Sequence, residues 1–162
     1  GSVLDQLVKI EADYYCTNGA IPMADGGIAA VEGTPMDFRT FSPVGRALRS
    51  DFVQLRQVGG FNHTYVLRKR ERGALELAAS MYDPGSGRKM EVYTTMPGLH
   101  FFSANKTPPR TGKCGATYDR QFGLCFETQF FSNSAKCTWF PSPVLRKENS
   151  YRQVTEFRFL VS

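Results

Sequence analysis

Helical periodicity is almost absent from this sequence, and its absence narrows the choice of fold class. Apolar residues alternate with polar ones in short runs, and turns rich in glycine and proline separate these runs at intervals of about ten residues. A chain with this spacing buries one face of each strand and reverses direction at each turn. The sequence therefore predicts an all-β fold, either an antiparallel β-sandwich or a barrel.

Six segments carry the strand signal most clearly. The expected strands lie at residues 64–67, 75–82, 90–95, 99–104, 123–131 and 151–161. Turns are expected at residues 68–73, 83–87 and 97–98, with a loop at residues 106–115, where prolines and glycines gather. The apolar side chains that share one face of the last strand are Tyr151, Phe157, Phe159 and Val161. Their alternation with polar residues predicts a strand buried on one face.

One segment, residues 43–58, has helical spacing. Its apolar positions are Val44, Leu48, Phe52 and Leu55. Ser42 is a residue type that caps helices, and Pro43 suits the first helical position. We therefore expect one short helix in this part of the chain.

Composition and length limit the class of protein further. The chain has 162 residues, 41% apolar and 13% aromatic, which is enough for one domain with a hydrophobic core and excludes a disordered chain. No apolar run approaches the roughly 18 residues of a membrane-spanning helix. The start at Gly1 lacks the basic and apolar regions of a signal peptide. These features predict a cytoplasmic protein with no membrane partner.

The cysteines and histidines do not form a metal-binding pattern. The four cysteines are Cys16, Cys114, Cys125 and Cys137, and no two of them stand in a C-x-x-C pair. A zinc site needs about four close ligands at recurrent spacings. We therefore expect no metal, and free thiols of the kind found in a reducing compartment.

A basic cluster at residues 68–72 raises the question of nucleic acid. Arginine and lysine supply most phosphate contacts, and the chain has aromatic residues suited to stacking on bases. The cluster, however, falls at an expected hairpin turn, where charged residues are usually solvated. We therefore expect no nucleic-acid partner, despite the net charge of +5.

The strand at residues 123–131 contains the best catalytic candidate. Cys125, Glu127 and Gln129 fall on one face, opposite a face of mostly apolar residues. A carboxylate between a thiol and an amide suits the wall of a pocket, where its pKa can shift toward neutrality so that it acts as a general base. A glutamate that pairs with an arginine for structural reasons fits the pattern equally well.

The two histidines leave similar alternatives open. His63 begins an expected strand, and His100 alternates with apolar neighbours within another. Either ring can act as acid, base or ligand. A hydrogen-bonded structural histidine is the commoner outcome for such positions, and no arrangement of a serine–histidine–aspartate triad can be argued from the sequence.

Several motifs resemble those of one enzyme family, the aldose 1-epimerases or galactose mutarotases. Residues 123–129 (GLCFETQ) resemble the segment around that family's catalytic glutamate, and residues 90–98 (MEVYTTMPG) resemble its LEVYTTQPG stretch. Residues 31–39 (VEGTPMDFR) and 60–63 (GFNH) resemble its VxGTPFDFR and GYDHN stretches, and residues 140–146 also fit. The similarities run from about Leu4 to Phe159 in the family's order.

The resemblance implies a fold, a reaction and a missing part. Family members are β-supersandwiches about twice this length, so residues 1–162 would form the C-terminal portion of such a domain, with its N-terminal half absent. The family interconverts the α and β anomers of free hexoses such as galactose and glucose, without metal or cofactor. A glutamate takes the proton of the C1 hydroxyl while a histidine protonates the ring oxygen.

The resemblance also assigns roles to residues of this chain. Glu127 matches the general base, Asn62 matches an aspartate that holds sugar hydroxyls, and Met96 matches a glutamine that lines the site. His63 and Gln129 lie in the same motifs and are expected to bind substrate. Asparagine and methionine accept hydrogen bonds more weakly than the residues they replace. The family's acid histidine and a substrate-binding arginine precede Gly1, so the chain alone is expected to be inactive.

Two hypotheses about function remain open. In the first, the chain is part of a hexose-acting isomerase and supplies its general base. In the second, it is a non-catalytic carbohydrate- or protein-binding β-sandwich derived from the family. In both cases half a supersandwich leaves sheet edges and apolar surface uncovered, so we expect a homodimer or association with the missing N-terminal half.

Overall fold

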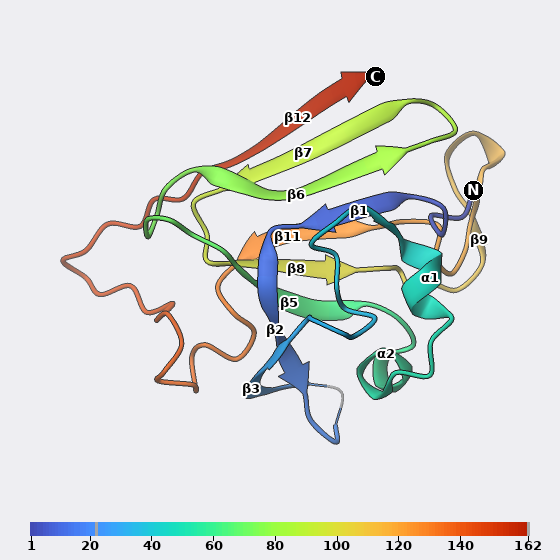
Figure 1. Ribbon diagram of the computed structural model, residues 1–162. Coiled ribbons are helices and arrows are strands. Elements are labelled where there is room, and N and C mark those ends of the chain that lie inside the picture. Colours follow the sequence, from blue (N-terminus) through green and yellow to red (C-terminus); the bar gives the residue numbers. More distant parts are fainter. Residues whose placement is uncertain (22, 162) are drawn as a thin grey trace.

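Two five-stranded antiparallel sheets stack on one another, as the computed structural model shows for residues 1–21 and 23–161 (Figure 1). Sheet A has the strand order β12-β7-β6-β1-β4, and sheet B has the order β11-β8-β5-β2-β3. The strands of sheet A are β1 (Leu7–Ile10), β4 (Ser42–Pro43), β6 (Glu76–Asp83), β7 (Arg88–Thr94) and β12 (Thr155–Val161). Those of sheet B are β2 (Ala12–Asn18), β3 (Ala24–Ala30), β5 (Asn62–Leu67), β8 (Gly98–Phe102) and β11 (Cys125–Gln129). A separate ribbon pairs β9 (Arg110–Thr111) with β10 (Thr117–Tyr118), and a short 3-10 helix (Lys113–Gly115) joins them.

The core lies between the two sheets and contains a cluster of packed aromatic rings. Phe101 of β8 is fully buried, with its ring centroid 4.8 Å from that of Phe61 and 5.2 Å from that of Phe126. The ring of Phe38 also contacts Phe61 and Phe101 edge to face. These contacts join β8, β11 and the segment before β5 into one hydrophobic unit, which fixes the position of sheet B.

The predicted fold class is confirmed, and all six predicted strands are present. The structure adds strands that the sequence pattern did not reveal, namely β1 to β4 in the first 43 residues and the β9–β10 ribbon within and after the expected loop. Three of these strands, β4, β9 and β10, have only two residues each, and β3 contains Gly26 and Gly27, so none of these four shows a clear alternation. Their pairing with neighbouring strands, rather than their own composition, makes them strands.

The prediction of one helix over residues 43–58 is wrong in its extent. The segment forms two short helices, α1 (Val44–Leu48) and α2 (Val53–Val58). Ser42 does not cap a helix, because it pairs with Val8 in sheet A, and the extended backbone of Phe52 separates the two helices. Within the described residues no helix is long and apolar enough to cross a membrane.

The expected half-burial of the last strand is also wrong. β12 pairs with β7 along its full length, but it forms the edge of sheet A (Figure 1). Phe159 is 77% exposed and Val161 is 82% exposed, and Phe157 and Leu160 are exposed as well. Alternation identified the strand correctly, but burial requires a layer that covers it, and no described residue provides one.

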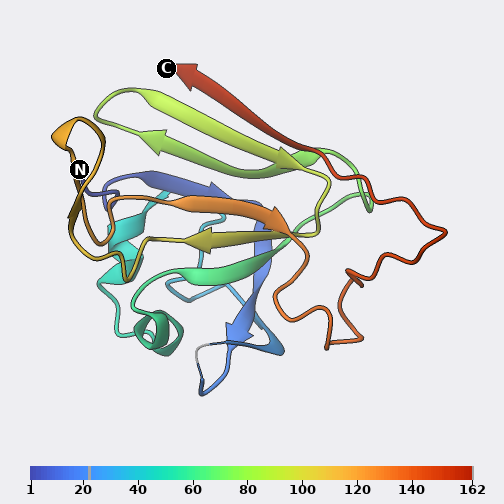
Figure 2. The same ribbon diagram turned by 180° about the vertical axis from the view of Figure 1, so that it is seen from behind.

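The segment between β11 and β12, residues 130–154, extends away from the two sheets (Figure 2). Its first part, residues 131–140, folds back on sheet B through the buried side chains of Phe131, Cys137 and Phe140. Most residues from 142 to 153 are exposed. The first part is therefore a wall of sheet B, and the second is open surface.

We predict that truncation of Phe101 destabilises the fold far more than truncation of an exposed phenylalanine on β12. Phe101→Ala removes the ring that joins the aromatic core, so the free energy of unfolding should fall by about 3–5 kcal/mol. Phe159→Ala is the matched control and should change it by less than about 0.5 kcal/mol. Urea unfolding followed by circular dichroism measures both, and equal losses would contradict this account of the core.

Candidate functional site

Strand pairing decides which side chains share the outward face of sheet B. β8 pairs with β5 on one side and with β11 on the other, and directly opposed residues of antiparallel strands point to the same side. Phe101 and Phe126 point into the core, so the alternate residues point outward. The three outward rows are Asn62–Phe102–Cys125, Thr64–His100–Glu127 and Val66–Gly98–Gln129.

Glu127 is exposed on this outward face. It lies directly across from His100, and no described residue donates a hydrogen bond or forms an ion pair with its carboxylate. The structural alternative of a glutamate paired with an arginine is therefore not what the structure contains. Glu127 lines none of the cavities described below, because this face of β11 is open.

His100 is the centre of a chain of polar contacts beside Glu127. Its Nε2 lies 3.0 Å from Asn62 Oδ1, and its Nδ1 lies 3.0 Å from Thr64 Oγ1. Thr64 Oγ1 in turn lies 2.8 Å from Ser132 Oγ. Burial lowers the pKa of His100, and the negative charge of Glu127 opposes that shift. The ring is therefore neutral at pH 7, with one nitrogen that donates and one that accepts.

The folded-back segment at residues 131–140 holds the far end of this chain in place. Gly98 has no side chain, and a Cβ there would come within 3.0 Å of both Phe131 and Thr64. Gly26 of β3 similarly leaves room for Cys137, and Trp139 Nε1 donates to the Gly26 carbonyl at 3.2 Å. These close approaches pack the segment against sheet B and place the Ser132 hydroxyl within hydrogen-bond distance of Thr64.

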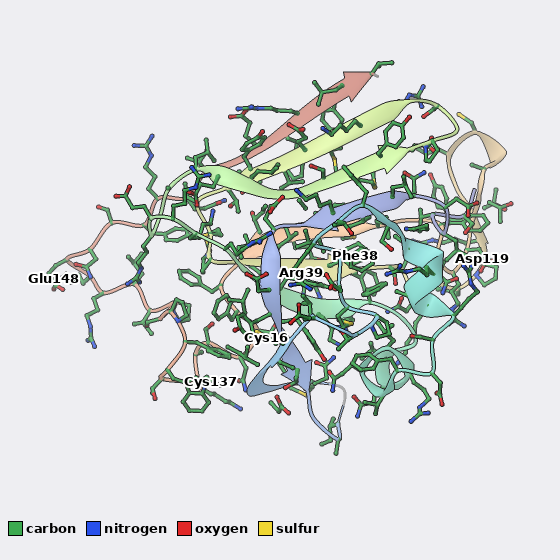
Figure 3. All side chains as sticks on the ribbon, viewed as in Figure 1. Cys16, Phe38, Arg39, Asp119, Cys137 and Glu148 are labelled. Atoms are coloured by element: carbon green, nitrogen blue, oxygen red, sulfur yellow. The ribbon has the colours of Figure 1, made fainter. Side chains whose placement is uncertain are left out.

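A small cavity of about 90 Å³ lies between this segment and the sheet. Asn62, His63, Thr64, His100 and Ser132 line it, together with Met23 and residues of β2 and β3. The labelled side chains of Cys16 and Cys137 mark where the covering segment meets β2 (Figure 3). The cavity is too small to hold a hexose.

His63 does not share the outward face with Glu127. It opposes Phe101 in the strand pairing, is 2% exposed, and contacts the ring of Tyr15 edge to face at 5.9 Å. Its Nδ1 accepts the backbone N–H of Asn62, and its Nε2 lies 3.0 Å from the Asn18 amide. Burial lowers the pKa of His63 to about 3, so the ring stays neutral. The ring also borders the small cavity that Asn62 and His100 line. Its expected role in substrate binding stays a prediction.

Met96 and Gln129 lie at one end of the outward face. Gln129 is half-buried and opposes Gly98, whereas Met96 is buried in the turn before β8. The hydroxyl of Tyr151 approaches Met96 Sδ at 3.5 Å. Met96 also lines a larger open pocket, whose other walls include Phe130, Trp139 and Arg152. The structure therefore brings Asn62, Glu127 and Gln129 to one face, with Met96 next to its end.

The remaining features singled out in the sequence are the basic cluster at residues 68–72 and the cysteines. In the basic cluster Arg68 forms ion pairs with Glu11 and Asp13, and Lys69 donates to the carbonyls of Ala74 and Thr94. All four cysteines are free thiols. Among the residues that the structure describes, no three His, Cys, Asp or Glu side chains lie close enough together to hold a metal ion.

The sequence patterns did not reveal that the side chains of Asn62, His100, Thr64 and Ser132 contact one another in series. The strand pattern placed His100 among apolar neighbours, but the partners of its ring come from β5 and from the segment after β11. The alternation within β8 was a usable signal, because His100 is out of phase with the core residues Leu99 and Phe101. The partners themselves depend on strand register, which the sequence pattern does not contain.

We predict that His63 makes the protein less stable in acid. Its pKa is about 3 in the folded state and near 6.5 in the unfolded state, so between these pH values the unfolded chain binds the proton more tightly. The free energy of unfolding should therefore fall as pH falls below 6.5, with a slope of up to about 1.4 kcal/mol per pH unit from this residue.

Unfolding by urea at several pH values measures this slope, and His63→Gln should reduce it. Because carboxylates contribute in the same range, the comparison is between wild type and variant rather than within one curve. His100→Gln is the control and should reduce the slope less, because the pKa of His100 is lowered against the opposing charge of Glu127. An NMR titration in which His63 takes up a proton near pH 6.5 would contradict the prediction.

Comparisons with known proteins identify the family. The sequence profile of aldose 1-epimerases matches residues 1–158. The galactose mutarotase of Sus scrofa is 33% identical over 162 residues, and the aldose 1-epimerase of Escherichia coli K12 is 30% identical over 162 residues. These matches cover 99% and 98% of this chain but only 45% and 46% of the relatives, so the chain spans slightly less than half their length.

Solved structures agree on the fold. An aldose epimerase homologue from C. elegans superposes with a TM-score of 0.85 at 22% identity, covering 99% of this chain and 47% of that one. A galactose 1-epimerase from Lactobacillus acidophilus superposes with a TM-score of 0.72 at 22% identity, covering 99% of this chain and 45% of that one. The two-sheet architecture is therefore the galactose-mutarotase-like fold, and the profile match shows that the chain belongs to the aldose 1-epimerase family.

Proposed function

We propose that this chain is the C-terminal portion of an aldose 1-epimerase and supplies its general-base glutamate, Glu127. One observation carries the proposal: the Glu127 carboxylate stands exposed and unpaired on an open sheet face that also presents Asn62, His100 and Gln129. An unpaired carboxylate is available to a ligand, whereas a structural carboxylate would form an ion pair with a neighbouring cation. The substrate class is a free hexose, such as galactose or glucose.

The chemistry assigned to the chain is one proton transfer. The Glu127 carboxylate takes the proton from the C1 hydroxyl of the cyclic sugar while an acid from elsewhere gives a proton to the ring oxygen. The bond between C1 and the ring oxygen breaks, the aldehyde group rotates, and the ring closes on its other face. As the ring closes, Glu127 returns its proton to the aldehyde oxygen, which becomes the new C1 hydroxyl, and the ring oxygen gives its proton back to the acid, so no cofactor is consumed. Asn62, Gln129 and Met96 are proposed to bind and orient the sugar, and the His63 ring supports Asn62 because its Nδ1 accepts the backbone N–H of Asn62.

Completion of the site is proposed to require an N-terminal half. The proposal is supported by the open face around Glu127, by the exposed apolar residues of β12, and by the greater length of the relatives. The acid that protonates the ring oxygen would come from that half. In its absence the same apolar surface is expected to pair with a second copy of the chain.

We expect Glu127→Gln to abolish most of the activity of the full-length protein that contains this chain. The substitution keeps the shape of the side chain but removes the base, and a positioned general base contributes about 10²–10⁴-fold to the rate. Polarimetry of freshly dissolved α-galactose measures the rate of mutarotation. Glu71→Gln, the same change in an exposed turn, is the matched control and should leave the rate unchanged.

Two results would contradict the catalytic proposal. If Glu127→Gln retains full activity, the base lies elsewhere. If the full-length protein accelerates mutarotation of neither galactose nor glucose, the non-catalytic binding hypothesis is favoured, since Asn62 and Met96 both weaken the polar grip on a sugar.

We also predict that the isolated chain associates. Sedimentation should show a dimer, and the dye ANS should fluoresce with it because apolar side chains of β12 are exposed. Phe159→Ser should weaken the association, and a matched substitution in the exposed loop, Val144→Ser, should affect it less. A monomer that does not bind ANS would contradict the proposal.

A further inference from the structure

His100 and Asn62 interact on the outward face in a way that the resemblance to known motifs does not explain. Asn62 occupies the position where the family resemblance places a sugar-binding aspartate, and its Oδ1 lies 3.0 Å from His100 Nε2. No described residue accepts a hydrogen bond from its Nδ2 group. The side chain is half-buried, so its free amide group is accessible from the outward face.

The contact with Asn62 determines which nitrogen of His100 donates a hydrogen bond. Asn62 Oδ1 is a pure acceptor, so Nε2 must carry the proton of the neutral ring. Nδ1 then accepts from the Thr64 hydroxyl, and Thr64 Oγ1 accepts from the Ser132 hydroxyl. Every donor in this series has an acceptor, so the contact with Asn62 sets the tautomer and the hydroxyls of Thr64 and Ser132 orient to fit it.

We propose that His100 is a positioning residue that holds the Asn62 amide with its N–H group toward the ligand. The outward face then offers a hydrogen-bond donor from Asn62 next to an acceptor from Glu127. An aspartate at position 62 would offer two acceptors there. This inference rests on the proposed function in naming a sugar as the ligand.

The pairing suits a ligand that carries hydroxyl groups. A hydroxyl oxygen accepts a hydrogen bond from Asn62 Nδ2, and its own proton is then free to point toward a carboxylate. Hydroxyls that accept in this way become slightly better donors, because hydrogen bonds in a chain polarise one another. His100 itself does not touch the ligand in this scheme and is not a catalytic residue.

Few charged groups lie around His100, so its titration directly reports on the contact between its Nε2 and the side chain at position 62. The titratable groups that act on it are Glu127, opposite it on β11, and His63 on β5, which is neutral. Asn62→Asp would add a carboxylate at Nε2 and should raise the pKa of His100 by about 1–3 units. Gln129→Glu is the matched control, since it adds a charge to the same face without touching the ring, and should raise the pKa by less.

The first experiment uses NMR on the chain with ¹⁵N-labelled histidine. We expect His100 to be the Nε2–H tautomer at pH 7 and Asn62→Asp to raise its pKa more than Gln129→Glu does. An Nδ1–H tautomer, or equal shifts in the two variants, would overturn the inference. Neither readout needs a sugar or activity, so the result stands even if the proposed function fails.

The second experiment uses mutarotation kinetics of galactose in the full-length protein. His100→Ala and Asn62→Ala should each raise KM several-fold with a smaller effect on kcat, and the double variant should be no worse than the poorer single one. His100→Gln should restore KM, because a glutamine amide can donate to Asn62 Oδ1 in place of Nε2. Additive effects of the two alanine substitutions, or failure of glutamine to rescue, would overturn the positioning role.

Discussion

The register of three strands, β5, β8 and β11, determines which of their side chains form the candidate site. The aromatic stack of Phe101 on Phe126 fixes which side of β8 and β11 faces the core, and the outward residues follow by alternation. A slip of one residue in β11 would send Glu127 into the core and bring Phe126 out. Hydrophobic packing on one side of the sheet therefore sets the polar chemistry on the other.

Two layers of support converge on the outward face. Beneath it, the aromatic core holds the strands; above one half of it, the segment at residues 131–140 covers Thr64 and the edge of His100. Gly98 allows that cover, because a Cβ there would lie 3.0 Å from Phe131, which is tighter than ordinary packing. The other half, around Glu127, is open. The family relationship and the short span of the chain relative to its relatives agree with a face that other protein structure covers. This agreement is the basis of the proposed N-terminal half.

The sequence predicted the parts of the fold that depend on local alternation. The six strands and the shared face of Cys125, Glu127 and Gln129 were predictable because period-two patterning is a local property. The strands before residue 44 were not, because β3 contains adjacent glycines and β4 has two residues held only by pairing with β1. The same pairing of Ser42 split the expected helix. Burial of β12 was misjudged because burial depends on a neighbour that a strand pattern does not reveal.

At the site, the position of Glu127 was predictable, but the contact between His100 and Asn62 was not, since it joins residues 38 apart through register. The catalytic role of Glu127 stays a prediction.

Trp139 is the only tryptophan of the chain, and it lies in the segment that covers this part of sheet B. Its indole is 70% exposed yet tied to the Gly26 carbonyl, so its emission spectrum depends on whether that segment is seated. The protein therefore carries a built-in optical reporter. Excitation of this single fluorophore would follow the docking of the segment in real time, without a label, against a background of tyrosines alone.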